Sequence, residues 1–343
     1  MRAKVGAMRG AIPEDSDVLG RVTRDNSADA LEFSRVLLDW YDRNMRTLPW
    51  RENGDPYRVW LSEIMLQQTR VAAVLEHYQR FLKKFPTVEK LAAARESSVL
   101  AAWSGLGYYR RARMLHAAAK QVARQYGGKF PRTSGELREL PGIGRYTAAA
   151  IASIAFGEAV AVVDGNVERV LSRIVGRRLA GEEVWSEAQT KLSAHRPGDF
   201  NQATMELGAT VCVPGVPKCL LCPVRSFCAA QGELVPNRSN GRQKKCHVQY
   251  ALGRREGAIF LVQRARDASL MPGMWELPEI DGNGAEKTLV RVRHSITVTD
   301  YAVRVIESMP PSEIQGTWVN QRRLASMALT GLTRKILQRT GYI

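Results

Sequence analysis

The apolar residues in the first part of the chain recur with the period of amphipathic helices. Phe33 and Leu37, for example, lie one helical turn apart and are followed by Trp40, as expected for a helix that buries one face. The same period predicts helices at residues 30–45, 57–69, 78–84, 88–94, 97–103, 167–175, 185–195 and 202–208, with two more that begin near Arg110 and Arg145. Residues 30–233 are therefore expected to form a mostly α region.

After His247 the pattern changes to an alternation of apolar and polar residues, which is typical of half-buried strands. Strands are predicted at residues 248–252, 258–264, 289–293 and 298–306, and a closing helix at residues 329–340. We expect a smaller α+β domain at residues 247–343. Residues 1–29 show no sustained period and are expected to be a flexible leader, and the polar, basic residues 234–246 a linker.

The chain is strongly basic: its 343 residues include 50 Lys and Arg against 34 Asp and Glu, a net charge of +16. Such an excess suits a polyanionic partner, because Lys and Arg displace counterions from phosphates. Ribosomal and membrane-surface proteins are also basic, so charge alone does not decide the class. No apolar run approaches the roughly 20 residues of a membrane helix, and residues 1–29 lack the apolar core of a signal peptide. We expect a soluble, intracellular protein.

Residues 137–166 contain the pattern of a helix-hairpin-helix. Pro141 and Gly142 end one short helix, Gly144 permits a backbone conformation that other residues resist, and a second helix of small residues follows. The backbone N–H groups of such a turn face outward at a helix N-terminus and can bind a DNA phosphate without reading the base. Polymerases, ligases and helicases carry similar turns, so the turn alone does not establish an enzyme.

Two acidic residues are candidates for chemistry on a nucleotide. Asp164 lies between an apolar run, residues 159–163, and a Gly-Asn pair, which predicts a half-buried carboxylate at the start of the next helix. Glu63 is the only acid of the helix predicted at residues 57–69 and has apolar neighbours, so it can face a pocket. The alternatives are a simple helix cap for Asp164 and a solvent-exposed position for Glu63.

A turn with two glycines precedes the paired Tyr108 and Tyr109. Such a turn can expose an aromatic side chain that wedges between stacked bases. The alternative is that one tyrosine belongs to the core and the other to the surface.

Four of the five cysteines are bunched within 17 residues, which favours a metal in a reducing compartment over disulfides. Four thiolates in one loop can hold a cubane cluster or a tetrahedral zinc. Zinc sites usually pair two Cys-x2-Cys units, and only one is present here, so the spacing favours iron–sulfur. Lys218 and Arg225 suggest that the loop presents a basic surface to DNA. Cys246 is expected to be an ordinary thiol. The four cysteines are Cys212, Cys219, Cys222 and Cys228.

Together, these motifs resemble the endonuclease III superfamily and, within it, the MutY-type adenine DNA glycosylases, over roughly residues 30–230. The resemblance implies a [4Fe-4S] cluster and a partner that is double-stranded DNA with an adenine opposite 8-oxoguanine or guanine. The adenine would be flipped out and its glycosidic bond hydrolysed in base excision repair. A monomer in the bacterial cytosol or nucleoid is expected.

The resemblance also implies roles for the candidate residues. Glu63, with a raised pKa, would protonate N7 of the leaving adenine. Asp164 would stabilise the oxocarbenium-like sugar, and Asn166 would orient water or Asp164. Tyr146 would shape the sugar site. Lyases of this superfamily carry a lysine at the Tyr146 position, so a monofunctional enzyme is expected.

DNA contacts follow from the same resemblance. Tyr108 would wedge beside the opposing base, and Gln68 would fill the gap that the flipped adenine leaves. Further contacts are expected from Arg51, Leu66, Thr69, Gly142, Ile143 and Gly144.

The second domain resembles the Nudix-like C-terminal domain of MutY through residues 260–264 and 273–278. The acidic helix of Nudix hydrolases is absent from this truncated version, so no pyrophosphate hydrolysis is expected. The family's lesion-recognition loop reads His-x-Phe-Ser-His, whereas here Ile296, Thr297 and Val298 occupy its last three positions. Thr297 keeps a hydroxyl, but valine cannot replace the histidine's hydrogen bond, so discrimination against guanine is expected to weaken. A loop shifted by a residue or two is the alternative.

Two other functions remain open at this point. A glycosylase of the same fold could act on another mismatch, such as thymine opposite guanine, because these motifs do not fix the specificity of the pocket. A DNA-binding protein with a lapsed site is disfavoured because Glu63, Asp164 and Asn166 occur together.

Overall fold

The computed structural model describes residues 26–232, 234, 244–281, 287–296 and 299–343. Most of the expected leader and linker therefore lies outside the described residues. Thr297 and Val298 of the expected lesion-recognition loop also lie outside them, as does the side chain of Ile296.

The helical region follows the predicted order of helices. Their bounds are α1 (Asn26–Asn44), the 3-10 turn η1 (Pro49–Arg51), α2 (Pro56–Leu66), α3 (Val71–Lys84), α4 (Val88–Ala92), α5 (Glu96–Trp103), α6 (Arg110–Gln125), α7 (Ser134–Leu137), α8 (Arg145–Phe156), α9 (Gly165–Val175), α10 (Glu182–Lys191) and α11 (Pro197–Thr210), with 3-10 turns η2 (Cys219–Leu221) and η3 (Arg225–Phe227) after it. Among the described residues, no helix is long and apolar enough to cross a membrane.

Several helices differ from their predicted limits; α10, for example, ends at Lys191 rather than at residue 195, and α11 begins at Pro197 rather than at residue 202. Helix α1 starts inside the expected leader, and α2 ends at Leu66 rather than at residue 69, because Gln68 takes a left-handed backbone conformation. Helix α3 begins at Val71, seven residues before the prediction. In its first turn Ala72 and Ala73 are exposed, and the apolar period that marks a helix becomes clear only from Val74 onward.

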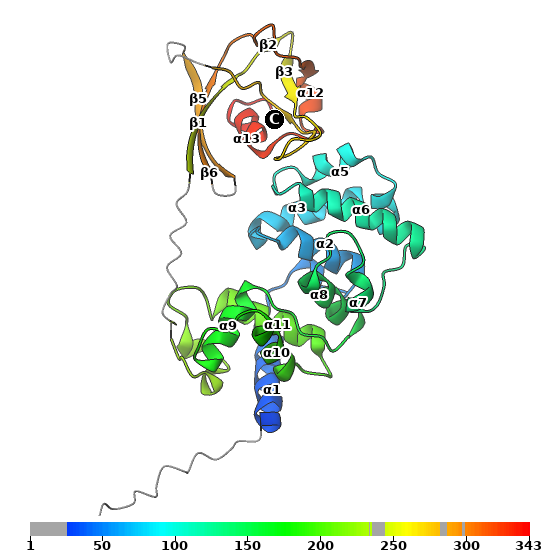
Figure 1. The fold of residues 1–343 in the computed structure, drawn as a ribbon, viewed down its shortest axis with the longest axis vertical. Coiled ribbons are helices and arrows are strands. Elements are labelled where there is room, and N and C mark those ends of the chain that lie inside the picture. The colour runs from blue at the N-terminus through cyan, green and yellow to red at the C-terminus, as the bar shows by residue number, and fades with distance from the viewer. Residues whose placement is uncertain (1–25, 233, 235–243, 282–286, 297–298) are drawn as a thin grey trace, which may run out of the picture.

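The helices form two groups, each with its own apolar core (Figure 1). One group consists of α2 to α8. The other joins α1 to α9, α10 and α11, so the N-terminal helix packs against helices far along the chain. Phe33 and Leu37 of α1 are almost fully buried there, in the same core as Phe200. The chain crosses between the groups near η1 and again after α8, and the candidate site lies at this junction.

Among its described residues, the C-terminal region consists of two small sheets and the helices α12 and α13 (Figure 1). In one sheet the order is β1-β6-β5, with β1 parallel and β5 antiparallel to β6. In the other, β3 pairs with β2, β4 and β7. The bounds are β1 (Lys244–Ala251), β2 (Arg254–Arg255), β3 (Ala258–Gln263), β4 (Trp275–Glu276), β5 (Thr288–Ile296), β6 (Thr299–Ile306), β7 (Thr317–Asn320), α12 (Gln321–Leu324) and α13 (Gly331–Arg339).

Strand β1 begins within the segment that was expected to be linker. Lys244 pairs with Thr299 and Cys246 with Tyr301, so backbone pairing extends the strand into a polar stretch whose side chains give no strand signal. Cys246 is half-buried and free of disulfide bonds, as an ordinary thiol would be.

Direct contacts dock the C-terminal domain on the α2–α8 group. The hydroxyls of Ser104 and Tyr109 donate to the carbonyl oxygen of Leu329 at 3.2 and 3.1 Å, and Arg334 Nε donates to Ser104 Oγ at 2.6 Å. Met274 is fully buried in the core of the helical group. The turn between Ser104 and Tyr109 is therefore bound at both of its ends by residues of the C-terminal region.

Candidate active site

The hairpin between α7 and α8 has the predicted form, with one correction. Gly142, not Gly144, takes the left-handed conformation, with a φ of +75°, whereas Gly144 is extended and caps α8. A Cβ on Gly142 would lie 2.5 Å from Cβ of Met114 on α6. Glycine is therefore required at position 142 by both its backbone conformation and the close approach of α6. The side chain of Ile143 is buried, so its contact with DNA would involve its backbone.

Glu63 is a buried acid that faces the pocket. It lies on α2, which starts at Pro56 because Asp55 caps it by accepting a hydrogen bond from Arg58 N at 2.8 Å. Glu63 is only 6% exposed. Burial raises its pKa to about 7, an effect that the nearby Asp164 reinforces and that a hydrogen bond from Tyr146 partly opposes. Near neutral pH the carboxyl can therefore hold a proton or release it.

Tyr146 connects the helices around this acid. It lies in the first turn of α8, and its hydroxyl donates to Glu63 Oε2 at 2.6 Å and approaches Met205 Sδ at 3.5 Å. Burial and the two neighbouring carboxylates raise the pKa of Tyr146 well above its usual value. The phenol thus stays a donor and occupies one oxygen of Glu63. Among the described residues no other hydrogen bond reaches the carboxyl, so its second oxygen is available to a ligand.

Asp164 is half-buried and caps α9, as expected from the sequence. Its Oδ1 accepts hydrogen bonds from the backbone N–H groups of Asn166 and Val167, both at 2.8 Å. Its Oδ2 accepts one from Asn166 Nδ2 at 2.9 Å. Of the two roles predicted for Asn166, orienting water or Asp164, this contact is compatible with the second. A carboxylate fixed by three donors cannot rotate, which suits it to stabilise a positive charge at one place.

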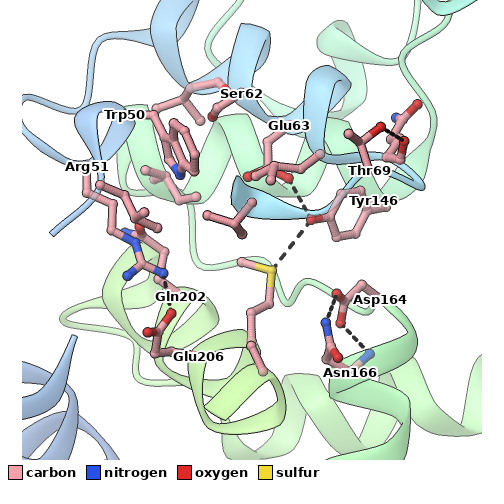
Figure 2. A pocket seen from close by; sticks show the side chains of 18 of the residues that line it. Trp50, Arg51, Ser62, Glu63, Thr69, Tyr146, Asp164, Asn166, Gln202 and Glu206 are labelled. Atoms are coloured by element: carbon pink, nitrogen blue, oxygen red, sulfur yellow. Dashed lines mark hydrogen bonds and ion pairs between the residues drawn. The ribbon is translucent and has the colours of Figure 1, made fainter. Parts of the chain in front are cut away.

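These groups line one pocket of about 730 Å³ between α2, α8 and α11. Figure 2 shows Glu63 with Tyr146 on one wall, Asp164 with Asn166 on another, and Arg51 with Glu206 on a third. The pocket is large enough for a base and its sugar.

The ion pair at the third wall was not found from the sequence. Glu206 is fully buried and accepts from Arg46 Nε at 2.5 Å and from Arg51 Nη2 at 2.9 Å. Burial alone would raise the pKa of Glu206, but the hydrogen bonds and charges of the two arginines outweigh it and hold the pKa below its usual range. Arg51, which was expected to contact DNA, thus lines the inside of the pocket. The available signal was that Glu206 is the only acid of its predicted helix, as Glu63 is of its own.

The predicted wedge residues occupy two loops beside the hairpin. Tyr108 is 47% exposed while Tyr109 is buried, an arrangement that fits both a wedge at Tyr108 and the alternative of one core and one surface tyrosine. Gln68 is exposed, and with Tyr108 it lines a second cavity of about 400 Å³ next to Pro141 and Gly142. Leu66 and Thr69 flank Gln68 along the edge of the first pocket.

The four clustered cysteines surround a small cavity behind α9. Their sulfurs have polar neighbours: Arg173 Nη1 donates to Cys212 Sγ at 3.3 Å, and the backbone N–H of Gln231 donates to Cys228 Sγ at 3.4 Å. Across the described residues, no three Cys, His, Asp or Glu side chains meet closely enough to hold a single metal ion. The four thiols line one cavity together, and four thiols are a donor set that can hold an inorganic group.

Helix α9 connects the cysteine loop to Asp164. Near its C-terminus, Arg173 donates to the carbonyl oxygens of Val213 and Gly215 at 2.8 and 3.0 Å. Near its N-terminus, Arg169 donates to Asn166 Oδ1 at 2.9 Å and to the carbonyl oxygen of Cys212 at 2.9 Å. The loop therefore supports the same helix whose first residues orient the carboxylate.

Comparisons with known proteins find similar DNA repair proteins. Residues 61–192 match the family described as the HhH-GPD superfamily base excision DNA repair protein. The chain is 49% identical to human adenine DNA glycosylase over 219 residues, which are 60% of this chain and 40% of that protein. It is 40% identical to the Arabidopsis thaliana adenine DNA glycosylase over 312 residues, 76% of this chain and 49% of that protein. It therefore spans about half the length of these relatives, or less.

Among solved structures, the fold is similar to that of a thermostable thymine-DNA glycosylase, with a TM-score of 0.57 and 30% identity over 61% of this chain and 99% of that one. The chain belongs to the HhH-GPD superfamily of base excision DNA repair proteins. The curated relatives that it matches at 40 and 49% identity are adenine DNA glycosylases.

Proposed function

We propose that the chain removes adenine from double-stranded DNA in which it is mispaired with 8-oxoguanine or guanine, by hydrolysing the N-glycosidic bond. The observation that carries the proposal is the pair of carboxyl groups in one pocket. Glu63 is buried, with a pKa raised to about 7, and Asp164 is fixed opposite it by three hydrogen-bond donors. Relatives that are 40 to 49% identical are adenine DNA glycosylases.

The pair divides the chemistry between an acid and an electrostatic stabiliser. Protonated Glu63 gives its proton to N7 of adenine as the bond between N9 and C1′ breaks, and the bonding electrons leave with the base. The sugar becomes cationic, and the Asp164 carboxylate stabilises it. Water then adds to C1′, and the proton it loses restores the acid. Tyr146 has no amine, so no Schiff base to the sugar forms, and the enzyme is monofunctional.

A thymine opposite guanine is the second candidate substrate, because a thymine-DNA glycosylase has a similar fold. The acid favours adenine over thymine. A buried acid helps a purine leave because N7 accepts its proton, and thymine has no such nitrogen.

Single-turnover base release tests the proposal. Duplexes carry adenine opposite 8-oxoguanine, guanine or cytosine, or thymine opposite guanine, and matched samples are run with and without alkali. We expect release of adenine, fastest opposite 8-oxoguanine, with strand cleavage only after alkali. Equal rates opposite 8-oxoguanine and guanine would fit weakened lesion reading by Ile296, Thr297 and Val298. Release of thymine in place of adenine would contradict the proposal.

We also propose that the cysteine loop holds a [4Fe-4S] cluster. Thiolates spread around a cavity, with donors such as Arg173 and a backbone N–H directed at the sulfurs, are the usual surroundings of such clusters. When bound, the cluster would tie the four cysteines of the loop to one another beside Arg173 of α9 and leave the hydrolysis to the pocket residues.

Iron and sulfide analysis of the purified protein tests the cofactor. We expect about four of each per chain and a brown colour. Cys219→Ser is expected to lower both contents and the melting temperature, because the loop loses one of the four ligands that tie it together, whereas Cys246→Ser is a matched control that should change neither. One zinc per chain, without sulfide, would contradict the cluster.

A further inference from the structure

Two loops near the hairpin hold non-glycine residues in a left-handed backbone conformation. The φ angles of Gln68 and Tyr108 are +57° and +46°. Such residues are strained and persist only where their surroundings hold them. Both side chains are exposed, and both line the cavity next to Gly142. The two residues with strained backbone are therefore the ones whose side chains project beside the hairpin turn at Pro141 and Gly142.

One side chain, Arg111 on α6, binds both loops. The four N–H groups on its Nη1 and Nη2 form six hydrogen bonds, three at each nitrogen, so some of them are bifurcated. The acceptors on the first loop are the carbonyl oxygens of Ile64 at 2.7 Å, Met65 at 3.0 Å and Gln67 at 2.6 Å, and Thr69 Oγ1 at 3.2 Å. On the second loop they are the carbonyl oxygens of Leu106 at 3.1 Å and Gly107 at 3.4 Å.

The hydrogen bonds from Arg111 to the first loop satisfy carbonyl groups at the C-terminal end of α2 that have no partner within the helix. These carbonyl groups are those of Ile64 and Met65, which accept from Arg111 Nη1. Ile64 follows Glu63 directly in the sequence. The same guanidinium therefore fixes the end of the helix that carries the acid and the loop that carries Gln68.

The guanidinium also contacts the second loop through its flat face. Its Cζ lies 5.5 Å from the ring centroid of Tyr108 and 5.4 Å from that of Trp103, distances at which a cation is attracted to an aromatic ring. Burial lowers the pKa of Arg111 to about 10, and Nε is buried without a partner in the described part of the chain. A planar fork is needed to join so many acceptors, and lysine cannot provide one.

We propose that Arg111 is a positioning residue that fixes the Gln68 and Tyr108 loops relative to each other and to Glu63. Gln68 and Tyr108 would then be held at a fixed distance from each other, so that extrusion of the base and contact with the opposite strand take place at the same base pair. This inference rests on the proposed function. Loss of Arg111 should lower base extrusion and the rate of base release, while the affinity for the duplex stays nearly unchanged.

The test compares Arg111→Lys and Arg111→Met with Arg124→Met, an exposed arginine of the same helix. The duplex carries 2-aminopurine at the adenine position, so its fluorescence reports extrusion, anisotropy reports binding, and single-turnover release from the adenine duplex reports rate. For both Arg111 variants we expect binding within about threefold of the wild type, and extrusion and release at least about tenfold lower. The Arg124 variant should match the wild type.

Rescue of extrusion by lysine would overturn the proposal, because charge alone would then suffice. An equal loss of binding and extrusion would also overturn it, as would wild-type rates in folded variants. If both Arg111 variants fail to fold, Thr69→Val removes one of the six hydrogen bonds, and an unchanged extrusion rate in it would count against the proposal. A wild-type protein that releases no adenine contradicts the proposed function, while the fluorescence still reports on Arg111.

Discussion

Asp164→Asn is expected to slow base release by about 10³-fold while leaving duplex binding within about threefold of the wild type. Asparagine caps a helix about as well as aspartate. Its side-chain oxygen can still accept from the backbone N–H groups of Asn166 and Val167, which Asp164 binds at 2.8 Å. Helix α9 should therefore begin at the same residue. What the substitution removes is the negative charge beneath the developing oxocarbenium ion.

Single-turnover release from the adenine:8-oxoguanine duplex, with anisotropy for binding, measures the two effects separately. Asp199→Asn is a matched control, because Asp199 is an exposed acid in the first turn of α11 and lies outside the pocket. The melting temperature of both variants should stay close to that of the wild type. Release by Asp164→Asn within about tenfold of the wild-type rate would remove Asp164 from its proposed role.

The local features of the site were predictable because they depend on neighbours in the sequence. An apolar run followed by Asp-Gly-Asn predicts a half-buried helix cap at Asp164, and the structure has it. Two glycines before Tyr108 and Tyr109 predict that one ring is exposed. For Glu63 the sequence left a choice between a pocket and solvent, and only the packing of α8 decides that it is buried.

The features that were missed depend on residues far apart in the sequence. Glu206 meets Arg46 across 160 positions, and Arg111 reaches Gln67 across 44. No local period marks such a pair, because each partner looks like an ordinary helix residue. The glycine error in the hairpin has the same origin. The sequence Gly-x-Gly permits a left-handed residue at either position, and the approach of Met114 selects Gly142.

Glu63→Gln is expected to reduce base release by about 10²- to 10⁴-fold, because glutamine has no proton to donate to N7. In the wild type the active form is the protonated acid, whose pKa is raised to about 7. The rate should therefore be highest below pH 7 and fall as the pH rises through about 7. A small residual rate in the glutamine variant should lack this fall. A wild-type rate that stays constant between pH 6 and 8.5 would exclude Glu63 as the acid.

The same pKa predicts that the acid destabilises the fold at high pH. A carboxyl whose folded pKa lies above its ordinary 4.5 contributes stability below pH 4.5 and loses it as the pH rises through about 7. The full loss amounts to about 3 kcal/mol. Glutamine can still accept from Tyr146 and carries no charge. Glu63→Gln should therefore melt about 5 °C or more above the wild type at pH 8 and within a degree or so of it at pH 5. Equal melting temperatures at pH 8 would mean that ionised Glu63 is solvated, which would also weaken its case as a general acid.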